Sequence, residues 1–165
     1  MANITLKGNP INTIGNLPEI GTKAKDFSLK TVALATNSLA NFKDKNIVLN
    51  IFPSVDTGTC ATSVREFNKK AAKLENTVVL CISKDLPFAQ ARFCGAEGIE
   101  NVVMLSDFAT GSFGKDYGLE ITNGPLVHLH SRAVIVIDTN GEVIYTEQVS
   151  DIVDEPNYEA ALKAM

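Results

Sequence analysis

Short apolar runs and a helical repeat alternate in the middle of the chain. Asn46 to Phe52 and Thr77 to Ser83 are mostly apolar runs of a length typical of buried strands. Between them the apolar positions recur every three or four residues: Ala61, Val64, Phe67, Ala71 and Leu74. This spacing predicts a helix from about Thr59 to Lys73. A strand-helix-strand unit of this kind favours two parallel strands in one sheet.

The pattern continues with alternating elements after the second run. We expect a helix over Pro87 to Cys94 that ends at Gly95, then a strand over Asn101 to Leu105. A short Gly-containing helical piece follows near Ser112 to Tyr117.

The last third contains the clearest hairpin. Ala133 to Asp138 and Glu142 to Gln148 flank Thr139-Asn140-Gly141, in which Asn-Gly supplies the positive φ angles of a tight turn. An amphipathic helix over Asn157 to Ala164 closes the chain.

The first thirty residues read as short strands joined by turns. We expect strands over Asn3 to Lys7 and Ile11 to Ile14, with a turn at Gly8-Asn9-Pro10, and a further strand over Phe27 to Thr31. The whole order predicts an α/β fold with a mixed central sheet flanked by helices. It is compatible with a single thioredoxin-like domain over residues 1–165 that carries an N-terminal β-hairpin extension.

Composition narrows the class of protein without identifying it. The chain has 165 residues, of which 45% are hydrophobic and 21% charged, as is usual for a globular protein. Its formal charge of -4 argues against nucleic acid or an anionic membrane as a partner. The N-terminal residues do not resemble a secretory signal, so we expect a cytoplasmic protein. Three cysteines are too few for a disulfide scaffold and suggest redox, catalytic or core roles.

Cys60 stands at the position where the sequence could make a thiol reactive. The loop Pro53-Ser54-Val55-Asp56-Thr57-Gly58-Thr59 delivers it to the start of the first predicted helix. Helix N-termini lower thiol pKa values, because unpaired N–H groups and the helix dipole favour the thiolate. Helix-end effects of about 0.3–1 kcal/mol fall short of the roughly 2.7 kcal/mol that a two-unit shift requires. A nearby cation should therefore contribute.

Three arginines could supply that cation: Arg65, Arg92 and Arg132. Arg132 directly precedes the apolar strand Ala133 to Ile137, where a guanidinium could stabilise a thiolate and substrate oxygens. Thr57 could aim its hydroxyl at the sulfur or act as a simple helix cap, and Pro53 could shield a thiolate from water or merely end a strand.

His128 and His130 alternate in a way that would place them on one side of a strand. They could act as metal ligands or as a base for the thiol, although no closed four-ligand spacing is present. Two other classes therefore stay open beside an enzyme. One is a thiol-disulfide redox sensor without substantial catalytic turnover, and the other is a noncatalytic α/β binding module.

The motifs together resemble those of the bacterial thiol peroxidases, which are atypical two-cysteine peroxiredoxins. The resemblance rests on Pro53 to Ala61, on Ser83 to Cys94, on Ser131-Arg132-Ala133 and on the N-terminal Lys7-Gly8-Asn9-Pro10, and it covers essentially the whole chain. It implies a thioredoxin-like fold and an antioxidant peroxidase acting on hydrogen peroxide and organic hydroperoxides. It also implies thioredoxin as the reductant, a homodimer and no cofactor.

The same resemblance assigns roles to individual residues. It makes Cys60 the peroxidatic cysteine and Cys94 the resolving cysteine, joined by an intramolecular disulfide during turnover. Thr57 and Arg132 would orient the peroxide, and Pro53 would shield the thiolate. Cys81 matches no catalytic position and lies in an apolar strand, so it is interpreted as a core thiol.

Overall fold

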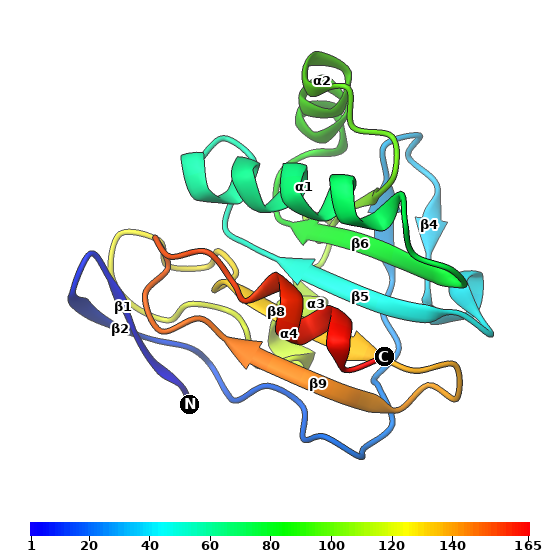
Figure 1. Ribbon diagram of the computed structural model, residues 1–165. Helices are drawn as coiled ribbons and strands as arrows, with labels where there is room; N and C mark the ends of the chain where they lie inside the picture. Colours follow the sequence, from blue (N-terminus) through cyan, green and yellow to red (C-terminus); the bar gives the residue numbers. More distant parts are fainter.

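A computed structural model describes all residues, 1–165, and contains a seven-stranded mixed sheet (Figure 1). The strand order is β4-β3-β7-β6-β5-β8-β9. The bounds are β3 (Leu29–Thr31), β4 (Thr36–Asn37), β5 (Asn46–Ile51), β6 (Thr77–Ser83), β7 (Val103–Ser106), β8 (Ala133–Ile137) and β9 (Val143–Gln148). The central strands β5, β6 and β7 are parallel, and every other pairing is antiparallel.

Helices cover both faces of this sheet. They are α1 (Gly58–Ala71), α2 (Pro87–Glu97), α3 (Ser112–Asp116), α4 (Tyr158–Lys163) and the 3₁₀ turn η1 (Leu39–Phe42). In Figure 1, α1 and α4 lie in front of the sheet, α3 lies behind it, and α2 stands at the top beyond α1. None of these helices has the length and apolarity needed to cross a bilayer.

The long apolar run of β5 follows from burial on both faces. Leu49 and Ile51 belong to the core behind the sheet, while Val48 belongs to the core beneath α1. A strand covered on both sides has no exposed alternate positions, which is why β5 is apolar except at Asn46, where it begins, and at the buried Asn50. The carboxyl ends of β5 and β6 therefore meet at one edge, where the loops leading to α1 and α2 begin.

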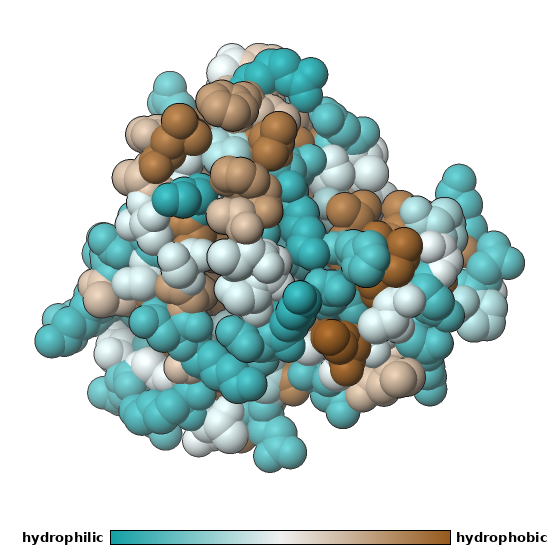
Figure 2. Space-filling model, turned by 180° about the vertical axis from the view of Figure 1, so that it is seen from behind, coloured by the Kyte–Doolittle hydropathy of each residue, from teal (hydrophilic) through white to brown (hydrophobic).

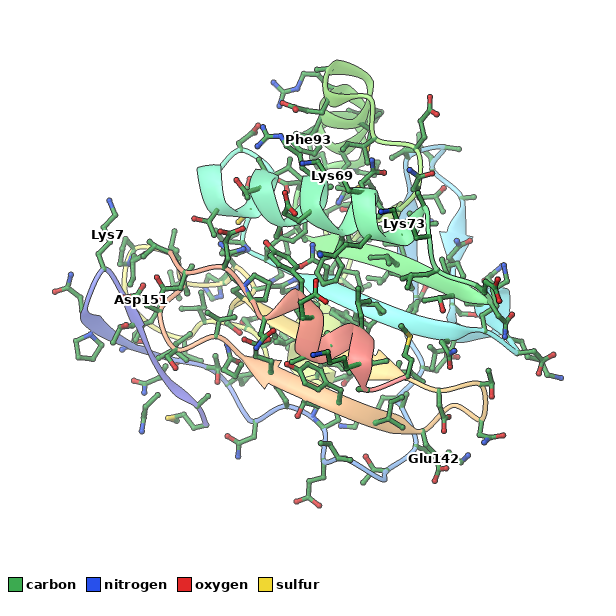
Figure 3. All side chains as sticks on the ribbon, viewed as in Figure 1. Lys7, Lys69, Lys73, Phe93, Glu142 and Asp151 are labelled. Carbon is green, nitrogen blue, oxygen red and sulfur yellow. The ribbon has the colours of Figure 1, made fainter.

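A separate hairpin of β1 (Asn3–Leu6) and β2 (Asn9–Asn12) packs beside the sheet. Its turn places Lys7 and Gly8 at φ 52° and 80°, as a two-residue hairpin turn requires. Asp151 holds this turn, because its carboxylate accepts hydrogen bonds from the backbone N–H groups of Lys7 and Gly8 at 3.1 and 2.9 Å (Figure 3). The hairpin is thereby fixed to the segment after β9.

The predicted α/β fold with a thioredoxin-like mixed sheet and an N-terminal hairpin is confirmed. Several boundaries differ. The second long helix does not end at Gly95 but continues to Glu97, because Gly98 takes the left-handed conformation that ends it. The short β4 and η1 were not predicted. His128 is not on a strand: it lies in a turn with φ 74°, so it does not share a face with His130.

Candidate active site

Cys60 lies in the first turn of α1, immediately beyond the carboxyl end of β5. Thr57 is the N-cap of this helix, with extended dihedral angles, and Pro53 ends the strand that precedes it. The thiol is fully buried. The sulfur therefore belongs to the N-terminal turn of α1, the end of the helix at which the helix dipole is positive.

Arg132 is the cation that contacts this sulfur. Its Nη2 donates to Cys60 Sγ at 3.1 Å, and its Nε donates to the carbonyl of Ile152 at 2.8 Å. Only 1% of Arg132 is exposed, and its Nη1 has no protein partner. The pairing of Ile51 with Ala133 between β5 and β8 brings the arginine to the end of the strand that leads to Cys60.

The other two candidate arginines form exposed ion pairs elsewhere. Arg65 is paired with Glu97 at 2.9 Å, and Arg92 is paired with Asp56 at 3.0 Å. Neither donates to Cys60. The structure therefore selects Arg132 from the three arginines that the sequence offered.

Thr57 does not contact the sulfur in this arrangement. Its hydroxyl donates to the Ser54 carbonyl at 3.2 Å, and it makes no side-chain bond to the helix that it caps. Pro53 is buried and has no N–H to offer. Both residues nevertheless line the hollow that leads toward Cys60.

That hollow has a volume of about 370 Å³, and most of its lining surface is apolar. Its lining comes from the hairpin, the Cys60 loop and the chain after β9: Leu6, Lys7, Pro53, Thr57, Gly58, Thr59, Leu126, Arg132, Ile152 and Val153. Cys60 itself does not line the hollow, but Arg132 does and also contacts Cys60, so a small oxygen ligand bound there would meet the guanidinium that contacts the thiol.

Cys94 occupies a different hollow. It is half-buried on α2, and burial raises the pKa of its thiol. It faces a mostly apolar groove of about 350 Å³ formed with Thr31, Val32, Ala91, Ile99, Val102, Val103 and Met104. This groove shares no lining residue with the hollow at Arg132, and all three cysteines are free. The two thiols therefore open in different directions.

Cys81 is buried in the middle of the sheet. Burial raises the pKa of its thiol to about 12. The side-chain amide of Asn50, which lies 3.6 Å from the sulfur, lowers the pKa only in part. A thiol with this pKa stays protonated near neutral pH and is a poor nucleophile. The environment of Cys81 is that of a core residue.

The histidines do not form a joint site. His130 is fully buried and pairs with Asp107 at 2.9 Å, whereas His128 is exposed and contacts Glu120 at 3.3 Å. No group of three or more histidines, cysteines or carboxylates is arranged to hold a metal. Neither histidine has a hydrogen bond to Cys60, so the base role considered for them has no geometric support.

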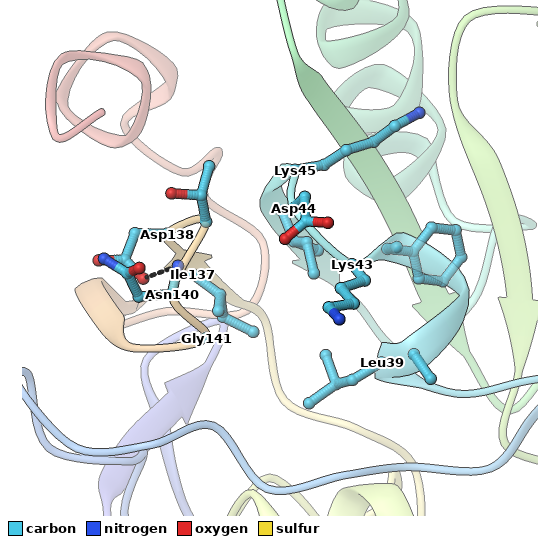
Figure 4. Close-up of a pocket in the computed structure, with 12 residues that line it drawn as sticks. Leu39, Lys43, Asp44, Lys45, Ile137, Asp138, Asn140 and Gly141 are labelled. Atoms are coloured by element: carbon cyan, nitrogen blue, oxygen red, sulfur yellow. Dashed lines mark hydrogen bonds between the residues drawn. The ribbon is translucent and has the colours of Figure 1, made fainter.

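A further hollow of about 280 Å³ lies at the other end of the sheet (Figure 4). It is bounded by the segments 39–45 and 137–141, and by Ile47 near the start of β5. Asp138 in its wall holds its own turn through the N–H groups of Asn140 and Glu142. The hollow is separated from Cys60 by the length of β5 and takes no part in the site.

Sequence reasoning did not identify Asp85, whose carboxylate binds the loop before Cys60. Ser54 Oγ donates to it at 2.7 Å, and the Val55 N–H donates at 2.9 Å. The sequence did contain a signal for this contact. Asp85 follows the carboxyl end of β6, and the Cys60 loop follows the carboxyl end of β5, which is the parallel neighbour of β6. Two such loops meet at one edge of the sheet.

Known proteins similar to this chain identify its family. The Redoxin family model matches residues 19–162. The thiol peroxidases of Mycobacterium bovis and Mycobacterium tuberculosis are each 56% identical over 165 residues, which cover 100% of this chain and 99% of theirs.

Solved structures show the same architecture. A peroxiredoxin-like protein from Aquifex aeolicus superposes with a TM-score of 0.93 at 37% identity, over 99% of this chain and 96% of that one. A thiol peroxidase from Chromobacterium violaceum gives a TM-score of 0.90 at 24% identity, over 98% and 93% of the two chains, and supports the fold alone. The resemblance noted in the sequence is confirmed: the chain belongs to the Redoxin family and, within it, to the bacterial thiol peroxidases of the peroxiredoxin type.

Proposed function

We propose that this peroxidase reduces hydroperoxides with Cys60 as the peroxidatic residue, forms a disulfide between Cys60 and Cys94, and is recycled by thioredoxin. The observation that carries the proposal is the 3.1 Å contact between the buried Cys60 Sγ and Nη2 of Arg132, a residue that also lines an accessible hollow. A buried thiol without such a cation would be an inert core group.

The first step is a displacement at oxygen. The Cys60 thiolate attacks the terminal peroxide oxygen, the O–O bond breaks, and sulfur is oxidised to a sulfenic acid. The departing oxygen takes a proton and leaves as water or an alcohol. Arg132 Nη1 has no other partner, so it is available to donate to the peroxide as negative charge develops. Thr57 borders the same space and would orient the peroxide through its hydroxyl, while Pro53 offers the thiolate no proton.

The second step joins two thiols that begin apart. The Cys94 sulfur attacks the Cys60 sulfenic acid, a disulfide forms and water is released. A disulfide requires Cα atoms within about 7 Å. Because Cys60 and Cys94 lie within different helices and face different hollows, we expect the first turn of α1, part of α2, or both to unwind.

Recycling requires a reduced dithiol protein that attacks this disulfide by exchange. Thioredoxin is the reductant that the family resemblance implies, and its presence in the cytoplasm supports a cytoplasmic location for this chain. The volume of the hollow and its mostly apolar lining support organic hydroperoxides as substrates in addition to hydrogen peroxide.

The assembly that we propose is a homodimer of single-domain subunits. Leu86, Phe88 and Phe108 are 51%, 65% and 45% exposed and follow the carboxyl ends of β6 and β7, at the edge that carries the site. Apolar side chains also interrupt the polar surface around the top of the molecule in Figure 2. Exposed apolar residues gathered near a functional edge are typical of an interface. A monomer by light scattering at micromolar concentration would refute the dimer.

The test is a thioredoxin-coupled assay of peroxide consumption with hydroperoxides of increasing size. Cys60→Ser should abolish turnover. Cys94→Ser should reduce about one equivalent of peroxide per chain and then stop, because no disulfide is available for exchange. A redox sensor without substantial turnover would instead form its disulfide while consuming peroxide only stoichiometrically, even with thioredoxin in excess.

A further inference from the structure

The carboxylate of Asp85 connects the segment that carries Cys60 to the segment that carries Cys94. On the Cys60 side it accepts from Ser54 Oγ at 2.7 Å and from the Val55 N–H at 2.9 Å. These two donors lie in the loop between Pro53 and Thr57. Both carboxylate oxygens are thus used to hold the chain that leads into α1.

On its own side Asp85 is anchored to the sheet. Ser83 Oγ donates to its carboxylate at 2.6 Å, and Ser106 Oγ donates to its backbone carbonyl. Gln90 of α2 reaches the same point, since its buried amide donates to Ser83 Oγ at 3.3 Å and to the Leu105 carbonyl at 3.0 Å. Asp85 therefore links the loop before α1 to the end of β7, and Ser83 connects it to Gln90 of α2.

Two other polar links join the same segments. The Arg65–Glu97 pair is bidentate, but it joins the middle of α1 to the end of α2 and does not touch the Cys60 loop. The Arg92–Asp56 pair does touch the loop, and its side chains are 67% and 63% exposed. Exposed ion pairs are screened by water and salt and contribute little. Charged hydrogen bonds from the part-buried donors Ser54 and Val55 are stronger. Asp85 is accordingly the main polar connection to the Cys60 loop itself.

We propose that Asp85 is a positioning residue that holds the Cys60 loop in its peroxide-reducing form and must release Ser54 and Val55 before Cys94 can reach Cys60. This inference rests on the proposed function. It makes the Asp85 connection a determinant of how long the Cys60 sulfenic acid persists.

The lifetime of the Cys60 sulfenic acid decides which of two reactions it undergoes. With Cys94 the sulfenic acid yields a disulfide and water. With a second hydroperoxide molecule it is oxidised instead to a sulfinic acid, as the O–O bond breaks and an alcohol or water leaves. Weakening the connection should speed the first reaction at the expense of the second. It should also slow the initial reaction of Cys60 with peroxide, because the loop that places Pro53 and Thr57 is less ordered.

The experiment compares Asp85→Ala with Asp56→Ala, which removes only the exposed pair with Arg92. Stopped-flow measurement gives the rate of Cys60 oxidation and the rate of disulfide formation, and mass spectrometry gives the sulfinic fraction at high peroxide. We expect Asp85→Ala to raise the disulfide rate about tenfold, to lower the oxidation rate several-fold and to reduce the sulfinic fraction. Asp56→Ala should change each by less than about twofold.

Ser54→Ala removes one donor from the opposite side of the connection, and it should shift both rates in the same directions by a smaller factor. If Asp85→Ala does not fold, Ser54→Ala tests the same connection in its place. Disulfide formation that is unchanged or slower in the folded variants would overturn the role of Asp85. Failure of the proposed function itself would be distinguishable, because the unmodified protein would then show no peroxide turnover.

Discussion

Arg132 and Cys60 form a buried contact of 3.1 Å in which the guanidinium is held from behind by the carbonyl of Ile152. The Nε–carbonyl bond leaves the arginine little freedom to turn away. One guanidinium nitrogen then faces the sulfur, and Nη1 stays without a protein partner. The arrangement is suited to stabilise charge first on the thiolate and then on the departing oxygen.

Replacing Arg132 by lysine should therefore lower the rate of Cys60 oxidation by about 10²-fold. A single ammonium group cannot reach the Ile152 carbonyl, the sulfur and a peroxide with the geometry of the guanidinium fork. Stopped-flow oxidation at pH 7 measures the effect, and alkylation by iodoacetamide should slow in parallel. Arg65→Lys serves as the control, because Arg65 does not contact the sulfur. An oxidation rate in Arg132→Lys within threefold of the unmodified protein would contradict the assignment.

The strands were predictable where burial controls the sequence. Thr77 to Ser83 was predicted with the bounds of β6, since a strand covered on both faces has few polar positions between its ends. The end of α2 was not predictable in this way. Both Gly95 and Gly98 are potential helix ends, and the choice of Gly98 depends on its left-handed conformation in the folded chain.

The site was predictable only in part for a similar reason. The helix start marked Cys60, and the need for a cation directed attention to arginines that included Arg132. Asp85 and Ile152 act through contacts made by chain segments far from Cys60 in the sequence. Such contacts depend on the register and closure of the sheet, and no local pattern encodes them.

Cys81→Ser should leave peroxide turnover unchanged. The thiol is buried in β6 and protonated near neutral pH, so it is not a competent nucleophile there. The serine hydroxyl can accept from the Asn50 amide in place of the sulfur. We therefore expect a stability change within about 1 kcal/mol, measured by urea unfolding. Loss of turnover in a folded Cys81→Ser protein would make Cys81, rather than Cys94, the candidate resolving thiol.

Acidification should detach the N-terminal hairpin through Asp151. Hydrogen bonds from Gly8, Thr5, Val153 and Lys7 lower the pKa of this carboxyl from 3.8 to about 2. The depressed pKa means that its contribution to stability is complete above about pH 4 and is lost as the pH falls toward 2. Hydrogen exchange in residues 3–12 should therefore accelerate over that interval.

Asp151→Asn provides the matched comparison. Its amide nitrogen cannot accept a hydrogen bond, so exchange in the hairpin should be fast already at pH 7 and should depend less on pH between 4 and 2. Because Leu6 and Lys7 line the hollow above Arg132, the variant should also raise KM for bulky hydroperoxides more than for hydrogen peroxide. Equal hairpin protection in the two proteins at pH 7 would show that Asp151 does not anchor this turn.

Gly95→Ala should slow disulfide formation without slowing the reaction of Cys60 with peroxide. Gly95 lies inside α2 next to Cys94, and a methyl group there would meet no atom within 4 Å. Alanine favours a helix interior over glycine by about 0.8–1 kcal/mol, so α2 becomes harder to unwind. If Cys94 must leave the helix to reach Cys60, this difference predicts up to a fivefold slower disulfide step, or about 0.95 kcal/mol.

Gly98→Ala is the contrasting variant, because φ 64° at this position disfavours alanine and destabilises the helix end. It should accelerate the same step. Equal disulfide rates in the two variants, with opposite changes in thermal stability, would show that Cys94 reaches Cys60 without unwinding α2.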